Sequence, residues 1–174
     1  LIVIKPIQSV GNDIGYLPGT LQEKLEPWTA PIKDNLNVLF VSDSTYNKPT
    51  NKNFKNQKNK IDNTYLEILM EQGIIEIEAV SFIRGRSIPN AYIVIDESQN
   101  LSMHELKTII TRAGEGTKIV LTGDVEQIDN QDVDSYTNGL SYAVDKFKSY
   151  DIAGHVTLIK GVRSKLATLA AKIL

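Results

Sequence analysis

The strongest constraint on the fold is an apolar run that ends abruptly in two carboxylates. Residues 91–95 read Ala-Tyr-Ile-Val-Ile, and Asp96 and Glu97 follow directly. A continuous apolar run of this length fits a strand that is buried on both faces of a parallel sheet. The residues after such a strand lie at the carboxyl edge of the sheet, where ligands bind in open α/β folds. The sequence therefore predicts acidic groups at a functional edge.

A second run of the same kind follows after about one helix. Residues 118–122 are Lys-Ile-Val-Leu-Thr, and Gly123 and Asp124 come next. Between the two runs, Ser102 and Glu105 have capping-box spacing, and Gly114 stands where a helix C′ glycine is expected. The pattern predicts a strand–helix–strand unit with acids at both strand ends.

The acids suit phosphoryl transfer, which needs a carboxylate for Mg²⁺ and a group that orients the attacking water. Asp96 fits the first role and Glu97 the second. The unit looks like the Walker B and sensor part of a P-loop nucleotidase. Residues 121–127 resemble the Gly-Asp-x-x-Gln motif of superfamily 1 helicases, and this resemblance implies that Gln127 senses the γ-phosphate.

One family is matched closely by three segments together. They are Asp-Glu-Ser-Gln-Asn at 96–100, Thr-Arg-Ala-Gly-Glu-Gly-Thr-Lys at 111–118, and Gly-Asp-Val-Glu-Gln-Ile-Asp-Asn at 123–130. These segments resemble the PhoH family, although Ser98 replaces the alanine usual there. The resemblance implies an ATPase that uses ATP and Mg²⁺. Gln99 and Asn100 fit satisfied turn residues, and we assign them no catalytic role.

Further basic residues take roles only through the resemblance. Arg163 matches an arginine that stabilises charge on the transferring phosphoryl group, within one subunit or across a ring interface, although Lys160 and Lys165 are nearby competitors. Arg84 and Arg86, in an Arg-Gly-Arg signature, suit phosphate or nucleic-acid contact, or else surface salt bridges. Lys5 ends an apolar run where the family usually has Arg-Pro; it contacts nucleic acid or phosphate, or is a solvated strand end.

The Walker A pattern is missing from this sequence. It requires Gly-Lys-Ser/Thr, and no such triplet occurs in the chain. The sequence also starts in a strand-like segment without methionine, so we expect it to be truncated before residue 1. The resemblance then implies a P-loop strand and helix upstream, and little or no hydrolysis by this chain alone.

Composition sets the broad limits. The 174 residues are 41% hydrophobic with a net charge of −2, which fits about one domain and gives no global basic field for nucleic acid. The absence of cysteine excludes disulfides and thiolate metal sites. His104 and His155 have no partner at ligand spacing and fit structural positions. No apolar stretch approaches the roughly 18 residues of a membrane span, so a cytoplasmic protein is expected.

These features predict a single α/β domain over residues 1–174, a RecA-like P-loop NTPase core with a mostly parallel sheet flanked by helices. Strands are expected at residues 1–4, 74–80, 92–96, 118–122 and 155–159. A helix over residues 21–40 is expected in two parts, because Pro27 and Pro31 each remove a backbone donor. Residues 45–60, rich in lysine and asparagine, are expected to form a mobile loop, or else to follow a single-stranded backbone.

The favoured hypothesis is a helicase-like ATPase coupled to RNA or another single-stranded nucleic acid, in a full-length protein that forms a homo-oligomeric ring. One alternative is a metal-dependent phosphodiesterase or ribonuclease, with Asp96, Glu97, Asp124 and Asp129 as a two-metal cluster. Gln127 and the strand spacing disfavour that alternative. A further alternative is a non-catalytic interaction domain that keeps the fold without its nucleotide.

Overall fold

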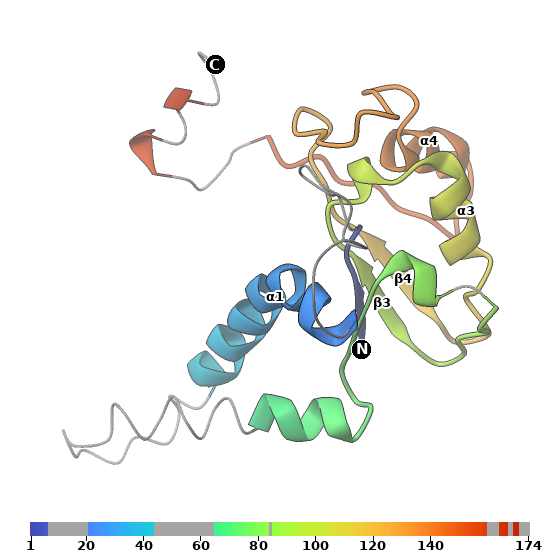
Figure 1. The fold of residues 1–174 in the computed structure, drawn as a ribbon. Helices are drawn as coiled ribbons and strands as arrows, with labels where there is room; N and C mark the ends of the chain where they lie inside the picture. Colours follow the sequence, from blue (N-terminus) through green and yellow to red (C-terminus); the bar gives the residue numbers. More distant parts are fainter. Residues whose placement is uncertain (7–20, 44–64, 84, 160–163, 167–168, 171–174) are drawn as a thin grey trace. The chain divides into compact units, whose positions relative to one another are not determined.

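A parallel sheet forms the framework of the chain. The computed structural model describes residues 1–6, 21–43, 65–83, 85–159, 164–166 and 169–170 (Figure 1). It contains two compact units, Leu1–Tyr142 and Ala143–Leu174. The first unit carries the sheet and both predicted acidic strand ends, and it is therefore the one that positions the candidate site.

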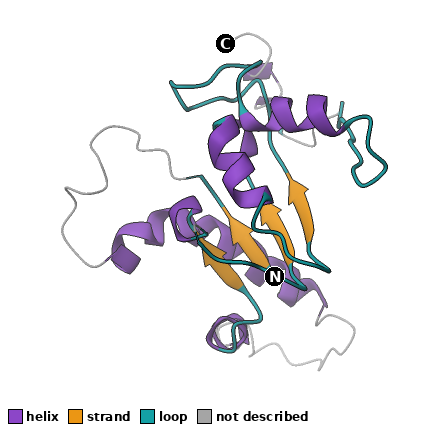
Figure 2. Ribbon diagram, turned by 90° about the vertical axis from the view of Figure 1, so that its right-hand side faces the viewer, coloured by secondary structure: helices purple, strands orange, loops and turns teal. Residues whose placement is uncertain are grey.

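The sheet has four strands in the order β2-β1-β3-β4, and every pairing is parallel. Figure 2 shows the four arrows pointing the same way. The strands are β1 (Ile2–Ile4), β2 (Glu76–Glu78), β3 (Tyr92–Ile95) and β4 (Lys118–Leu121). The predicted α/β class with a parallel sheet and flanking helices is confirmed.

The central strand β3 has the burial that its composition predicts. Ile93 and Ile95 are fully buried, and Val94 is half-buried. In the ladder, Ile95 lies opposite Ile4 on one side and Leu121 on the other. The apolar run therefore fits between two neighbours, and the ends of β1, β3 and β4 align at one edge.

Helix α3 (Met103–Ile110) joins β3 to β4, and its predicted start is confirmed. The Ser102 hydroxyl accepts a hydrogen bond from the Glu105 backbone N–H, and the Glu105 carboxylate accepts one from the Ser102 backbone N–H. Such a cap contributes about 1 kcal/mol. Leu106 and Ile109 form its buried face.

The predicted role of Gly114 as the C′ residue is wrong. Helix α3 ends at Ile110, and the glycine with positive φ after it is Gly116, at 72°. Gly114 instead donates its N–H to the carbonyl of Ile88 at 2.7 Å, and a Cβ there would lie 2.9 Å from the Pro89 Cα. The glycine is needed because another backbone segment approaches closely.

Helix α1 (Leu21–Asp43) is continuous, so the predicted division near Pro27 and Pro31 is also wrong. Each proline removes a single donor. Pro31 would have donated to the carbonyl of Pro27, four residues earlier. Both missing hydrogen bonds therefore lie in one short part of the helix, and the helix continues through it. The helix at residues 65–71 is followed by Gly73, whose φ of 67° is the left-handed conformation that commonly ends a helix.

The predicted strand at residues 155–159 is not formed. These residues have no regular secondary structure, and Val156, Leu158 and Ile159 are 80%, 87% and 96% exposed. A strand exists only as part of a ladder, so strand-like composition is insufficient where no neighbour pairs. The loop expected at 45–60 lies outside the described residues.

Helix α4 (Gly139–Phe147) begins directly after Asn138. The Asn138 side chain accepts a hydrogen bond from the Ser141 N–H at 2.9 Å and caps the first turn. Among the residues that the structure describes, no helix is both long and apolar enough to span a membrane.

The burial of β3 gives a test of the sheet. Ile93→Ala should lower the free energy of unfolding by about 2–5 kcal/mol, because it opens a cavity where this fully buried side chain packs against the face of the sheet. Ile68→Ala removes the same atoms from a side chain that is 41% exposed, and its effect should stay within about 0.5 kcal/mol. Urea denaturation followed by circular dichroism measures both. Equal losses for the two variants would contradict the placement of β3.

Candidate active site

Asp96 lies at the point where β1, β3 and β4 end together. Its backbone N–H donates to the carbonyl of Ile4 at 2.9 Å, which extends the β1–β3 ladder by one residue. The Thr122 hydroxyl, at the end of β4, donates to the Asp96 carboxylate at 2.9 Å. Asp96 is therefore oriented by a neighbouring strand, and its second carboxylate oxygen has no hydrogen bond to the described residues that would compete with a cation.

Glu97 adopts a backbone conformation that is unusual for its residue type. Its φ and ψ are 53° and 39°, in the left-handed region, which costs a non-glycine residue about 1–3 kcal/mol. The next residue holds this turn in place, because the Ser98 N–H and hydroxyl both donate to the Thr122 carbonyl, at 2.9 and 2.8 Å. Strain of this kind is concentrated at functional sites.

Gln99 is fully buried beneath this turn. Its side-chain nitrogen donates to the Glu97 carboxylate at 2.7 Å and to the Gln127 carbonyl at 2.8 Å. Its side-chain oxygen accepts from the Asp124 N–H at 3.2 Å. One amide thus connects the residues that follow β3 to those that follow β4.

Asn100 makes a parallel connection one residue later. Its side-chain oxygen accepts from the backbone N–H groups of Asp129 and Asn130 at 2.8 and 3.2 Å. The Asn130 side chain returns a hydrogen bond to the Asn100 carbonyl at 2.9 Å. The segment after Gln127 is therefore anchored to the β3 loop by side chains, a role that the sequence reasoning did not foresee.

Gln127 ends a turn, residues 124–127, that is held by hydrogen bonds between its own residues. Its backbone N–H donates to the Asp124 carbonyl at 3.0 Å, and its side-chain nitrogen donates to the Asp124 carboxylate. The other oxygen of that carboxylate accepts from the Glu126 N–H at 3.0 Å. Asp96, Glu97 and this Asp124–Gln127 turn are thus brought to one edge of the sheet.

The predicted basic residues are distributed differently. Lys5 follows β1 and is half-buried at the same edge as Asp96. Arg84 and Arg163 lie outside the described residues. Arg86 is paired with Glu76 at 2.9 Å and lies 3.9 Å from Glu78, on the edge strand β2. Since β1 separates β2 from β3, Arg86 is not brought to Asp96.

The charges around Arg86 influence one another. The hydrogen bond to Glu76 raises the pKa of the Arg86 guanidinium. Burial and the neighbouring Glu76 charge raise the pKa of Glu78 above its ordinary value, and the Arg86 charge lowers it.

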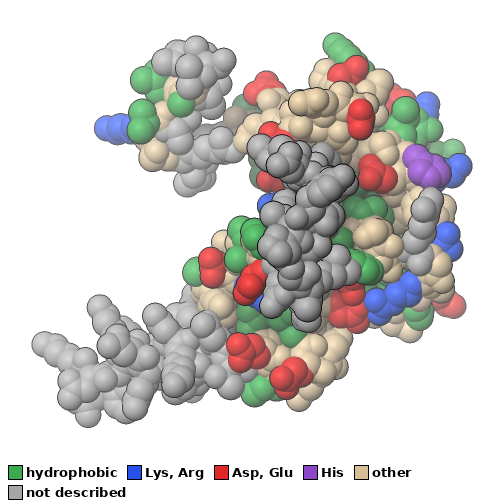
Figure 3. Space-filling model, in the orientation of Figure 1, with side chains coloured by type: hydrophobic (Ala, Val, Ile, Leu, Met, Phe, Trp, Pro, Cys, Tyr) green, Lys and Arg blue, Asp and Glu red, His purple; other side chains and the backbone are tan. Residues whose placement is uncertain are grey.

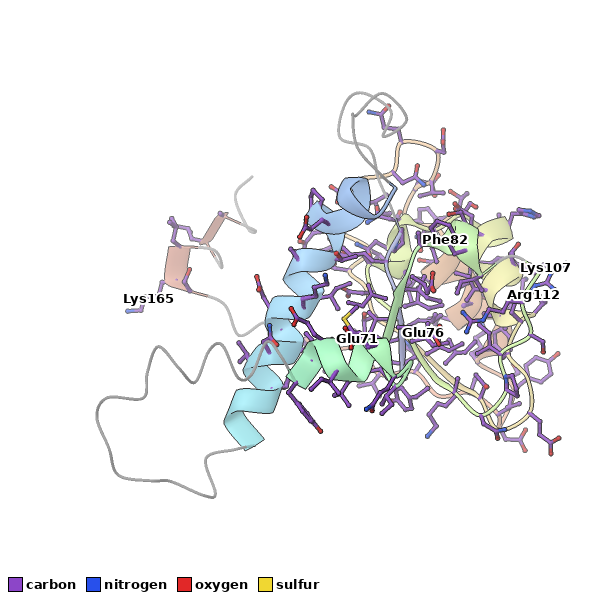
Figure 4. All side chains as sticks on the ribbon, turned by 60° about the horizontal axis from the view of Figure 1, so that its bottom comes forward. Glu71, Glu76, Phe82, Lys107, Arg112 and Lys165 are labelled. Atoms are coloured by element: carbon purple, nitrogen blue, oxygen red, sulfur yellow. The ribbon has the colours of Figure 1, made fainter. Side chains whose placement is uncertain are left out.

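The charged side chains are distributed over more than one side of the first unit. Figure 4 shows Glu71 and Glu76 on one side of the first unit and Lys107 and Arg112 on the other. On the face drawn in Figure 3, most Lys and Arg side chains of the first unit lie toward its right-hand edge, whereas Asp and Glu side chains are spread across it.

The donor set at Asp96 fits Mg²⁺, which binds proteins through one or two carboxylates and completes its shell with water and substrate phosphates. No group of three or more acidic or histidine side chains that would hold a metal ion occurs in the described part of the chain. Asp96, Glu97 and Asp124 instead have separate hydrogen-bond partners.

The close approach at Gly123 allows a test of the β3–β4 connection. A Cβ at this position would collide with the Gln99 side-chain oxygen and lie 3.0 Å from the Leu140 Cδ2. We expect Gly123→Ala to lower the free energy of unfolding by about 1–3 kcal/mol, the usual cost of overpacking. Gly154→Ala is the control because a Cβ there meets nothing within 4 Å. A thermal shift for Gly154→Ala as large as that for Gly123→Ala would contradict the contact.

Comparison with known proteins identifies the family of the chain. The family model described as "PhoH-like protein" matches residues 1–174. Protein PhoH2 of Bacillus subtilis is 52% identical over 174 residues, which are 100% of this chain and 36% of that protein. Protein PhoH2 of Mycolicibacterium smegmatis is 31% identical over 175 residues, 100% of this chain and 35% of that protein.

A relative with a different name matches less of the chain. The PhoH-like protein of Bacillus subtilis is 34% identical over 151 residues, 87% of this chain and 40% of that protein. The chain thus spans somewhat more than a third of the length of these relatives. The match over every residue, together with the arrangement of its motifs at one sheet edge, establishes that the chain belongs to the PhoH family.

Proposed function

We propose that the full-length protein is a Mg²⁺-dependent ATPase whose water-activating and sensing residues lie at the edge where β3 and β4 end. The observation that carries this proposal is the hydrogen-bonded connection of Glu97 to the Asp124–Gln127 turn. Hydrolysis of a phosphoanhydride depends mainly on positioning and charge stabilisation, and this edge supplies residues of the required types in fixed positions.

Each residue has a distinct proposed role. Asp96, oriented by the Thr122 hydroxyl, holds Mg²⁺, which when bound neutralises charge on the phosphates. Glu97 accepts a hydrogen bond from the attacking water and positions it. The Gln127 amide, now donating to Asp124, exchanges that partner for a terminal phosphate oxygen. Arg163, by family resemblance, stabilises charge on the transferring group.

The phosphate cradle is proposed to lie in the rest of the protein. The sequence contains no Gly-Lys-Ser/Thr triplet, and the chain covers only 36% of its Bacillus subtilis relative. Backbone amides of a P-loop and its lysine normally bind the triphosphate. The proposed activity therefore belongs to the full-length protein, and this chain by itself is expected to hydrolyse little ATP.

Coupling to RNA or another single strand extends the proposal. Lys5 supports it best among the described basic residues, because it lies at the same edge as Asp96. Arg86 supports it less, because Glu76 and Glu78 already balance its charge. A homo-oligomeric ring, with Arg163 acting across its interface, is proposed from the family resemblance alone.

Replacement of Glu97 tests the ATPase. In the full-length protein, Glu97→Gln should lower kcat by roughly 10²–10⁴-fold, the usual contribution of a positioned general base, and should leave ATP binding intact. Steady-state phosphate release measures the first quantity and titration with a fluorescent ATP analogue the second. The control is Glu115→Gln, the same chemical change at an exposed residue that precedes β4, at the opposite end of the strands from Glu97, which should keep the kcat of the unmodified protein.

Three outcomes would decide against the proposal. Undiminished turnover of Glu97→Gln would remove Glu97 from catalysis. Failure of the full-length protein to bind ATP would favour the non-catalytic interaction domain. Cleavage of RNA with metal and without nucleotide would favour the phosphodiesterase, despite the separate partners of its carboxylates.

A further inference from the structure

We propose that Gln99 is a positioning residue that sets the distance between Glu97 and the Asp124–Gln127 turn. This inference rests on the proposed ATPase and deepens it, because it assigns a role to a side chain that contacts neither substrate nor metal. The observation behind it is a fully buried amide with hydrogen bonds to both parts of the site.

The hydrogen bonds of Gln99 fix the orientation of its amide. The nitrogen faces two acceptors, the Glu97 carboxylate and the Gln127 carbonyl, and the oxygen faces a donor, the Asp124 N–H. A flipped amide would place its oxygen against both acceptors and its nitrogen against the donor, so that all three contacts become repulsive. The network therefore requires an amide, with its donor on one side and its acceptor on the other.

Close packing leaves Gln99 little room to move. Gly123 lies directly against it, so that an added Cβ would collide with the Gln99 side-chain oxygen and lie 3.2 Å from the Gln99 backbone nitrogen. The turn after β4 can approach this closely only because residue 123 lacks a side chain. A buried group held on this many sides keeps one rotamer, which is what a positioning role demands.

The consequence for the reaction concerns Glu97. Its left-handed backbone gives it an unfavourable intrinsic conformation, and its carboxylate is held by the Gln99 amide at 2.7 Å. Without that hydrogen bond, the Glu97 side chain can adopt other rotamers. The same amide holds the Gln127 carbonyl, so that its loss separates the water-positioning group from the sensor as well.

A second buried amide provides a matched comparison. Asn138 is also fully buried, and it donates to the Asp134 carbonyl at 2.8 Å and to the Ser141 hydroxyl at 3.0 Å. These partners lie in α4 and in the segment just before it, and they include none of the proposed catalytic residues. Replacement of Asn138 by an apolar residue therefore measures the general effect of removing a buried amide.

The experiment compares Gln99→Met and Asn138→Leu in the full-length protein. Methionine is unbranched, has a similar length, and offers no N–H donor. We expect Gln99→Met to lower kcat roughly 10- to 100-fold, as misplacement of a catalytic group does, with the KM for ATP changed less than about twofold. Asn138→Leu should reduce the melting temperature to a similar extent and retain a kcat close to that of the unmodified protein.

A double substitution tests whether Gln99 acts through Glu97. In a Glu97→Gln background, Gln99→Met should change the remaining kcat by less than about twofold, because residues that act as a unit are not additive. A purely structural role would give the same fold loss in both backgrounds. Gln99→Glu is the second variant, in case Gln99→Met does not fold, since it keeps the shape of the side chain and its acceptor oxygen but replaces the donor with an acceptor.

The outcomes separate this inference from the proposed function. If the unmodified protein does not hydrolyse ATP, or if Glu97→Gln remains active, both ideas are overturned. If Glu97→Gln is inactive while Gln99→Met and Gln99→Glu retain kcat, only the role of Gln99 is overturned. The role of Gln99 is also overturned if Gln99→Met lowers kcat no more than Asn138→Leu does. It is overturned as well if Gln99→Met lowers kcat by the same factor in the Glu97→Gln background.

Discussion

The parallel ladder on both sides of β3 is the interaction on which the rest of the structure depends. It continues past the strand ends, because the Asp96 N–H donates to the Ile4 carbonyl and the Thr122 N–H donates to the Ile95 carbonyl, each at 2.9 Å. When parallel strands pair in register, the residues that follow them lie side by side. The backbone geometry alone therefore brings together Asp96, Thr122 and the turns that follow them.

Buried polar side chains then complete what the ladder begins. Ser98, Gln99 and Asn100 follow one another along the chain and are all buried, a costly arrangement unless each is hydrogen-bonded. Ser98 binds the end of β4, Gln99 the turn after it, and Asn100 the segment beyond that turn. A buried polar network in which every group is hydrogen-bonded stabilises one conformation of the loop over the alternatives. This explains how the strained Glu97 turn persists.

Several features that depend on neighbouring residues in the sequence were predictable, although the continuity of α1 through Pro27 and Pro31 was not, and features that depend on distant partners were missed. The capping box at Ser102 and the acidic end of β3 follow from local spacing and composition. Gln99 resembled an ordinary turn residue because its partners at Asp124 and Gln127 lie 25 and 28 positions away. Gly114 was misassigned for the same reason, since its neighbour is Pro89 rather than its own helix. Residues 155–159 have strand composition, but composition does not supply a pairing partner.

The backbone ladder and the buried polar side chains hold different parts of the site. The ladder fixes Asp96 to the sheet itself, whereas the Asp124–Gln127 turn has no regular secondary structure and depends on side chains of the β3 loop. Two of the three Gln99 hydrogen bonds go to that turn, and Asn100 holds Asp129 and Asn130 just beyond it. The Asp124–Gln127 turn is therefore connected more directly to the Glu97 loop than to Asp96, the carboxylate proposed to bind Mg²⁺. In the ATPase that we propose, this arrangement would couple Gln127, at the terminal phosphate, to Glu97, at the attacking water, while the Asp96 carboxylate stays fixed to the sheet.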